Sequence, residues 1–181
     1  RSPEAGSPRR ATAMSKIFAI GDIHGCLDKL RKLLGLIDVD WENDTVVFMG
    51  DYIDRGPDSK RVVDYVLELR KKHEQVVCLK GNHEWMFLNY LDHREEHLYL
   101  TNGGRDTLQS YGISPDEQDR RAKLPPKHLQ FFETLLPCYE TENYVFAHAG
   151  VRPGIPMGLQ DPYDLIWIRH DFFMSDHGLK K

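Results

Sequence analysis

Three short apolar segments, each followed by a glycine-containing turn and then a helical pattern, constrain the fold of this chain most strongly. The apolar segments cover residues 16–20, 44–49 and 75–80. The helical patterns cover residues 25–37, 59–72 and 84–100. Apolar residues in the first of these patterns recur at helical spacing. Because buried strands alternate with helices, the first half predicts an α/β fold with a largely parallel, covered sheet.

The second half continues the same domain. Residues 101–136 are expected to form helices and loops, including an amphipathic segment with a proline start at 124–136. Residues 138–150 predict a hairpin that turns at Glu142 and Asn143. Residues 1–13 are rich in Pro, Ser, Arg and Ala, and we expect a disordered leader or an expression remnant there. No repeat or linker divides residues 14–181, so one domain is predicted.

Composition excludes several classes of protein. The chain has 181 residues, of which 40% are hydrophobic and 29% charged, which fits neither a disordered nor a membrane protein. A net charge of −4 argues against a nucleic-acid partner. No apolar run approaches the roughly 18 residues that a membrane span needs, so no membrane partner is expected. Cys26, Cys78 and Cys138 are far apart, which favours free thiols and a cytoplasmic location.

Residues that can bind metal ions follow the predicted strands. Four turns carry them: Asp22 and His24 in GDIHG, Asp51, Asp54 and Arg55 in GDYIDRG, Asn82 and His83 in GNHE, and His148 in HAG. Ligand sites of open α/β sheets form at the carboxyl ends of the strands. We therefore expect these four turns to converge on one site.

The residue types suit a centre of two metal ions. Carboxylate, imidazole and amide ligands together favour Mn²⁺, Fe or Zn²⁺ over Ca²⁺, which takes oxygen ligands. Asp22 and His24 are two positions apart, so an extended backbone places both side chains on the same side. Two metals about 3.5–4 Å apart lower the pKa of a shared water and neutralise phosphoryl oxygens. This chemistry predicts hydrolysis of a phosphoester.

The four motifs in this order resemble the signature of the calcineurin-like metallophosphoesterase superfamily. More narrowly, they resemble its PPP-type serine/threonine protein phosphatases. The segments NGGRDTLQSYG and LIWIR are similar to bacterial and phage members, and the resemblance runs from about Lys16 to about Phe173. It implies a layered sandwich of mixed β-sheets flanked by helices, with the metal site at the carboxyl ends of the strands.

The resemblance also implies a ligand set for two divalent ions, with Mn²⁺ as the first choice. Asp22 and His24 would hold the first ion together with Asp51. Asp51 would bridge to the second ion, which Asn82 and His148 complete.

Four further residues take catalytic roles by the same resemblance. His83 matches the general acid that protonates the leaving group, and Asp54 the carboxylate that orients it. Arg55 and Arg169 match two arginines that hold phosphoryl oxygens. A hydroxide that bridges the metals would attack phosphorus directly, so no protein nucleophile is needed.

The family has one more histidine ligand in a downstream Gly-His turn, which this sequence lacks. His177 lies too close to Arg169 and follows no predicted strand, so it is not assigned that role. We therefore expect the catalytic domain at 14–181 to be incomplete at its C-terminus and weakly active.

Three functions remain open on the sequence alone. The preferred one is dephosphorylation of phosphoserine and phosphothreonine proteins, with phosphotyrosine as an extension. The alternatives are hydrolysis of dinucleoside tetraphosphates or other nucleotides, and a metal-binding fragment with little catalysis. The sequence assigns no oligomeric state.

Several other residues are expected to be structural. Surface positions are predicted for His73, His93, His97, His128 and His170. Cys26 is expected to be a small packed residue, whereas Tyr52 either lines the substrate cleft or packs in the core.

Overall fold

The computed structural model describes residues 15–175, which form two small sheets and the helices around them. The first sheet contains β1 (Ile17–Ile20), β2 (Thr45–Phe48) and β3 (Val76–Cys78) in this order. All its strands are parallel, with Ile17 opposite Thr45 and Val46 opposite Val76. The expected parallel sheet is thus present, each strand slightly shorter than its apolar segment.

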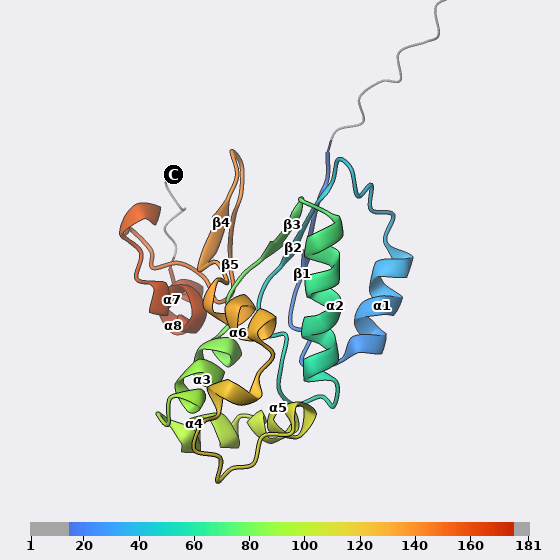
Figure 1. The fold of residues 1–181 in the computed structure, drawn as a ribbon. Coiled ribbons are helices and arrows are strands. Elements are labelled where there is room, and N and C mark those ends of the chain that lie inside the picture. The colour runs from blue at the N-terminus through green and yellow to red at the C-terminus, as the bar shows by residue number, and fades with distance from the viewer. Residues whose placement is uncertain (1–14, 176–181) are drawn as a thin grey trace, which may run out of the picture.

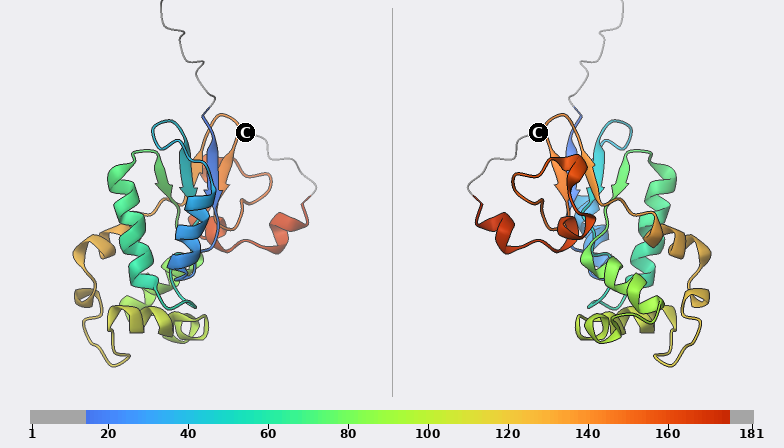
Figure 2. Two further views of the ribbon diagram at one scale, coloured as in Figure 1. Left: turned by 90° about the vertical axis from the view of Figure 1, so that its right-hand side faces the viewer. Right: turned by 90° about the vertical axis from the view of Figure 1, so that its left-hand side faces the viewer.

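Helices cover one face of this sheet, and a hairpin lies on the opposite side. The covering helices are α1 (Leu27–Leu36) and α2 (Ser59–Lys72), as Figures 1 and 2 show. The hairpin pairs β4 (Cys138–Glu140) with β5 (Val145–Ala147) in antiparallel fashion, as the sequence predicts. Parallel and antiparallel pairing are therefore divided between two sheets.

The remaining helices lie at the carboxyl ends of the strands and beside the hairpin. Those at the strand ends are α3 (Asn82–Leu91), α4 (Glu96–Thr101), α5 (Gly104–Tyr111) and α6 (Pro126–Glu133). Those beside the hairpin are α7 (Pro162–Trp167) and α8 (His170–Phe173). Two short 3₁₀ helices span Arg121–Lys123 and Met157–Leu159. Within the described part of the chain, no helix has the length and apolar character to cross a membrane.

The core forms between the parallel sheet and α2. Val46, Val47 and Phe48 of β2 are completely buried, which fits a central strand covered on both faces. Helix α2 buries its valine stripe against them and ends with three basic residues, where the helix dipole favours positive charge. Tyr52 is also completely buried and donates to the Leu79 carbonyl at 3.0 Å. Of its two expected roles, Tyr52 therefore has the packing one.

The helical pattern predicted at 84–100 is two helices rather than one. Helix α3 already begins at Asn82, and the break before α4 has His93 and Glu95 in left-handed conformations, with φ of 56° and 51°. Residues 92–97 are all polar, and such a run also fits an exposed turn of a continuous helix, so periodicity alone does not locate the break. Leu33, in the predicted apolar stripe of α1, remains 41% exposed.

The surface prediction for His128 is wrong, because its side chain is fully buried. Its Nε2 lies 2.9 Å from Asp64 Oδ1 and its Nδ1 lies 2.9 Å from the Tyr111 hydroxyl. Both ring nitrogens are thus satisfied without water, which makes burial tolerable. The cluster joins α2, α5 and α6.

The other expected surface histidines are mostly exposed. His93, His97 and His170 are exposed, whereas His73 is half-buried and stacks on Trp41 at 4.4 Å between ring centroids. Cys26 is half-buried, and all three cysteines are free, as expected. The predicted leader and His177 lie outside the described residues.

Candidate metal centre

The turns after β1, β2, β3 and β5 meet around Asp51, whose side chain is buried. Asp51 Oδ2 lies 3.7 Å from His24 Nε2, and Asp51 Oδ1 lies 3.6 Å from His148 Nε2. One carboxylate oxygen therefore faces each of two histidines from separate turns. This is the arrangement that a ligand bridging two cations requires.

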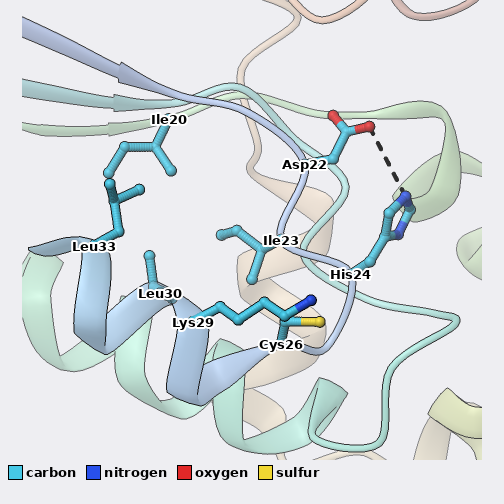
Figure 3. Close-up of a pocket in the computed structure, with 8 residues that line it drawn as sticks. All are labelled: Ile20, Asp22, Ile23, His24, Cys26, Lys29, Leu30 and Leu33. Carbon is cyan, nitrogen blue, oxygen red and sulfur yellow. Dashed lines mark ion pairs between the residues drawn. The ribbon is translucent and has the colours of Figure 1, made fainter.

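Asp22 and His24 lie at the end of β1, and Figure 3 shows their side chains directed toward one another. His24 Nε2 is 3.9 Å from Asp22 Oδ2. The other ring nitrogen, Nδ1, lies 2.8 Å from the Ile53 carbonyl and must donate its proton there. This bond leaves Nε2 as the acceptor nitrogen, on the side of the carboxylates, which is the tautomer that an ion would need. A cavity of about 260 Å³ lies beside this pair, against α1.

His148 and Asn82 form the other side of the site. His148 Nδ1 donates to the Met49 carbonyl at 2.9 Å, so its Nε2 carries a lone pair. That nitrogen lies only 2.9 Å from Asn82 Oδ1, so two acceptors face one another as the amide is oriented. A cation bound by both atoms would remove this conflict between two acceptors, as expected if His148 and Asn82 are metal ligands. The donor set therefore fits a divalent ion.

Two groups of potential ligands place their atoms within 4.8 Å of one another. One contains His24, Asp51 and His83, and the other contains Asp22, Asp51 and His148. Asp51 belongs to both, as expected for the bridging residue. Asp22 belongs to the group of His148, although the expected ligand set pairs it with His24, from whose Nε2 its Oδ2 lies 3.9 Å.

His83 and Asp54 form a buried pair. Asp54 Oδ2 accepts from His83 Nδ1 at 2.7 Å. The other oxygen, Oδ1, accepts from the Tyr99 hydroxyl at 2.8 Å and the Thr107 hydroxyl at 2.6 Å. These bonds hold the carboxylate, which in turn orients the imidazole. Sequence reasoning missed Tyr99 and Thr107, because both lie in the middle segment far from the four motifs.

Arg55 lies over the two imidazoles. Its guanidinium nitrogens are 2.8 Å from His24 Nε2 and 3.1 Å from His83 Nε2. Since arginine can only donate, both imidazoles accept through Nε2 and are neutral in this arrangement. The Arg55 backbone N–H donates to the Gly103 carbonyl at 3.1 Å, which fixes the turn while the side chain remains exposed. The guanidinium therefore stays accessible from solvent above the histidines.

Arg169 is not part of this cluster. It is exposed, and its guanidinium donates to the Ile168 carbonyl at 2.9 Å. No hydrogen bond or ion pair joins Arg169 to the four turns within residues 15–175. Its role at the phosphate therefore stays a prediction.

Glu84 is a buried residue of the site that sequence reasoning did not assign. Its carboxylate accepts from the backbone N–H groups of Asp51, Tyr52 and Gly81, at 2.9, 2.8 and 2.9 Å. Burial, with the nearby charge of Asp51, raises the pKa of Glu84 to about 8. Bound cations would oppose that rise. The position of Glu84 at the end of the GNHE motif was the sequence signal that could have assigned it to the site.

The backbone is strained at four site residues. His24, Asp51, Asp54 and Arg55 have φ of 43°, 53°, 71° and 66°, in the left-handed region that residues other than glycine rarely adopt. Such strain persists only where surrounding contacts enforce it, as at ligand sites. The turn at Gly81 admits no larger residue, because a Cβ there would overlap Asp51 Oδ1.

Residues 15–179 match the calcineurin-like phosphoesterase family. This chain is a calcineurin-like metallophosphoesterase. The family implies divalent metal ions, and the histidines and carboxylates around Asp51 fit that requirement. The α/β fold and the calcineurin-like superfamily expected from the motifs are confirmed, whereas the narrower assignment to PPP-type protein phosphatases stays a prediction.

Two curated relatives of this metallophosphoesterase carry the same enzyme name. A symmetrical bis(5′-nucleosyl)-tetraphosphatase of Legionella pneumophila (strain Lens) is 32% identical over 171 residues, covering 90% of this chain and 57% of that protein. One from Nitrosospira multiformis is 33% identical over 148 residues, covering 76% of this chain and 44% of that protein. The chain therefore spans about half the length of these relatives.

Solved structures share the fold. A crystal structure of a protein to which diadenosine tetraphosphatase activity is attributed has a TM-score of 0.60 at 24% identity, covering 83% of this chain and 57% of that one. A serine/threonine phosphatase structure from Saccharomyces cerevisiae has a TM-score of 0.57 at 21% identity, covering 85% and 52%. Both likenesses concern the fold alone. The named sequence relatives therefore favour the dinucleotide alternative over the preferred protein phosphatase function.

Proposed function

We propose that this chain carries the active site of a symmetrical bis(5′-nucleosyl)-tetraphosphatase. Such an enzyme would hydrolyse a dinucleoside tetraphosphate at its central anhydride and give two nucleoside diphosphates. The position of Asp51, with one carboxylate oxygen toward each of two histidines, carries the phosphoesterase chemistry. The choice of substrate is supported by relatives that cover 90% of the chain at 32% identity.

The metal-binding residues are already arranged to hold divalent cations. Asp22, His24, Asp51, Asn82 and His148 would hold two divalent ions, with Mn²⁺ as the first choice and Fe or Zn²⁺ as alternatives. When bound, such ions lower the pKa of water and neutralise phosphoryl oxygens. Hydrogen bonds to the Ile53 and Met49 carbonyls fix the histidine tautomers before any ion arrives.

The remaining site residues would bind the phosphoryl oxygens and protonate the leaving oxygen. Arg55 would leave the two imidazoles and pair with phosphoryl oxygens, for which its planar fork is suited. His83 Nε2, freed from Arg55, would carry a proton to the leaving oxygen, while Asp54 holds the ring through Nδ1. A leaving nucleoside diphosphate needs less protonation than an alkoxide, because the second pKa of a phosphate is about 6.

The test is a product analysis with purified protein, Mn²⁺ and diadenosine tetraphosphate. We expect ADP as the only nucleotide product. A phosphoserine peptide and p-nitrophenyl phosphate serve as competing substrates under the same conditions.

Each other outcome rejects the proposal in a defined way. Formation of ATP and AMP would show asymmetrical cleavage. Turnover of the peptide without the dinucleotide would restore the protein phosphatase function. Metal binding without turnover of any of the three substrates would indicate a non-catalytic metal-binding fragment.

A further inference from the structure

A second cavity, of about 250 Å³, lies between the start of α3, the end of β3 and helix α7. Its walls are formed by Lys80, Trp85, Leu135, Pro137, Pro162, Tyr163 and Ile166. None of these residues belongs to the metal-binding turns or to the catalytic set. The lining is mostly apolar and aromatic with a single charged group, as in many sites for small organic ligands.

The cavity adjoins the Asn82 and His148 side of the metal centre. Trp85 follows Asn82 by three positions in α3, so the two side chains lie on the same side of that helix. On the opposite wall, the N–H of Ala149 donates to the Leu165 carbonyl at 2.8 Å. This bond ties the turn that carries His148 to α7, whose residues line the cavity.

Aromatic rings give the cavity a preference for flat ligands. The ring centroids of Trp85 and Tyr163 are 5.5 Å apart with the planes at 74°. Tyr163 also stacks on Trp167, at 6.0 Å and 29°. Half of Tyr163 is exposed, so part of the side chain is open to a ligand. Nucleobases stack on such rings with little dependence on base identity.

Lys80 supplies the only formal charge in the lining. Its side chain is half-buried, and within residues 15–175 the carboxylates of Glu84 and Glu133 attract its ammonium without forming a hydrogen bond or ion pair with it. A half-buried charge with no direct partner favours a ligand that brings negative charge. Lys80 also stands two residues before Asn82, which is one of the expected metal ligands. A phosphate chain running from the cavity to the centre would pass this ammonium.

We propose that this cavity binds the nucleobase of a nucleoside polyphosphate, with the ring against Trp85 and Tyr163 and the adjoining phosphate beside Lys80. The inference rests on the proposed function, because it places one nucleoside of the dinucleotide beside the metal centre. It assigns substrate selection to α7 and to the first turn of α3.

The experiment measures tryptophan fluorescence while ADP is added in the presence of Mn²⁺. We expect ADP to quench the emission and pyrophosphate, which has no base, to leave it unchanged. Trp85→Phe should remove most of the quench. Trp41→Phe is the matched control, because Trp41 stacks on His73 rather than lining this cavity, and it should leave the quench intact.

Variants of Tyr163 test the same contact without loss of the reporter. Tyr163→Ala should weaken ADP binding about tenfold or more, the effect of losing one stack between a base and a ring. Tyr163→Phe keeps the ring and should bind ADP as the wild type does. The ratio of kcat/KM for diadenosine tetraphosphate to that for p-nitrophenyl phosphate should fall with Tyr163→Ala. Lys80→Met should weaken ADP more than adenosine.

The two proposals fail separately. If the wild type forms ADP from the dinucleotide but Tyr163→Ala binds ADP with unchanged affinity, the cavity assignment is wrong and the proposed function stands. If the dinucleotide is not hydrolysed, the ADP titration still decides whether the cavity takes a base. Tyr163→Ala that impairs only phosphopeptide turnover would make the cavity a peptide site instead.

Discussion

At the scale of single residues, the metal centre should be most sensitive to substitution of Asp51, because its two oxygens face two different ligand groups. Asp51→Asn removes a charge that both ions would share, so both should bind more weakly. We expect metal content and activity to fall together, measured by elemental analysis and a phosphatase assay on the same sample. Full occupancy with wild-type turnover would contradict the bridging role.

Asp44→Asn is the matched control for that substitution. Asp44 is also a buried aspartate, but it accepts from the backbone N–H groups of Lys16 and Asp40 at the start of β2. A loss of stability without a loss of bound metal is expected there. The pair of variants separates metal binding from general effects of changing a buried carboxylate.

His83 should respond differently, because it is assigned to a proton and not to an ion. General acids contribute roughly 10²–10⁴-fold, so His83→Asn should lower kcat for a phosphoserine peptide by about that factor. The loss should be smaller for p-nitrophenyl phosphate and for diadenosine tetraphosphate, whose leaving groups need little protonation.

Metal content should stay near normal in His83→Asn, and His170→Asn, at an exposed histidine, should match the wild type. Equal losses of rate for all three substrates would argue against the acid role. The comparison needs only initial rates and does not depend on which substrate is physiological.

At the scale of elements, the buried His128 joins α6 to Asp64 of α2 and to Tyr111 of α5. Burial lowers the pKa of His128 below its usual 6.5, although Asp64 opposes this and Lys127 and Lys60 reinforce it. The unfolded chain therefore takes up this proton at a higher pH than the folded chain. The contribution of neutral His128 to the free energy of unfolding is fully present above about pH 6.5 and is lost as the pH falls through the folded pKa.

The measurement is the melting temperature at about pH 7.5 and about pH 5.5 for wild type and His128→Gln. Glutamine does not titrate, so the decrease at the lower pH should be smaller in the variant. Each unit of pKa difference is worth about 1.4 kcal/mol. His97→Gln, at an exposed position, should keep the wild-type pH dependence. Parallel curves for wild type and His128→Gln would refute the assignment.

The same scale shows what the sequence could predict. Local periodicity gave the three strands, their helices and the hairpin, because strand and helix patterns depend on near neighbours. The four turns were predictable too, since parallel strands end at one edge of a sheet. The burial of His128 was not, because its partner Asp64 is 64 residues away. A helical pattern shows which residues share a face, but not what covers it.

Residues that act through contacts distant in sequence could not be predicted for the same reason. Thr107 reaches Asp54 across 53 residues and Tyr99 across 45, and neither lies in a motif with metal ligands. Arg169 is the opposite case, a residue assigned by resemblance that the structure leaves outside the cluster. Resemblance transfers a residue's role, whereas placement depends on the packing of α7 and α8.

At the scale of the whole molecule, bound metal should stabilise the fold, because its ligands come from turns on both sheets. A ligand present at 100 times its Kd adds about 2.7 kcal/mol. For a chain of this size, Mn²⁺ should then raise the melting temperature by about 5–10 °C, and EDTA should reverse the rise. Ca²⁺ should do less, since it takes oxygen ligands only. No shift with Mn²⁺ in the wild type, or the same shift in Asp51→Asn, would count against the metal centre.

The hydrogen bonds of the buried Glu84 carboxylate also have a consequence for the rates of folding and unfolding. This carboxylate accepts from N–H groups 32 and 33 residues away, so we expect the turn that presents Asp51 to form only after β2 and β3 have paired. Metal would then find its ligands in place only late in folding, beyond the main barrier. Interactions absent from the transition state slow unfolding and leave the folding rate unchanged. In stopped-flow experiments, Mn²⁺ should therefore lengthen the lifetime of the native chain without speeding its refolding.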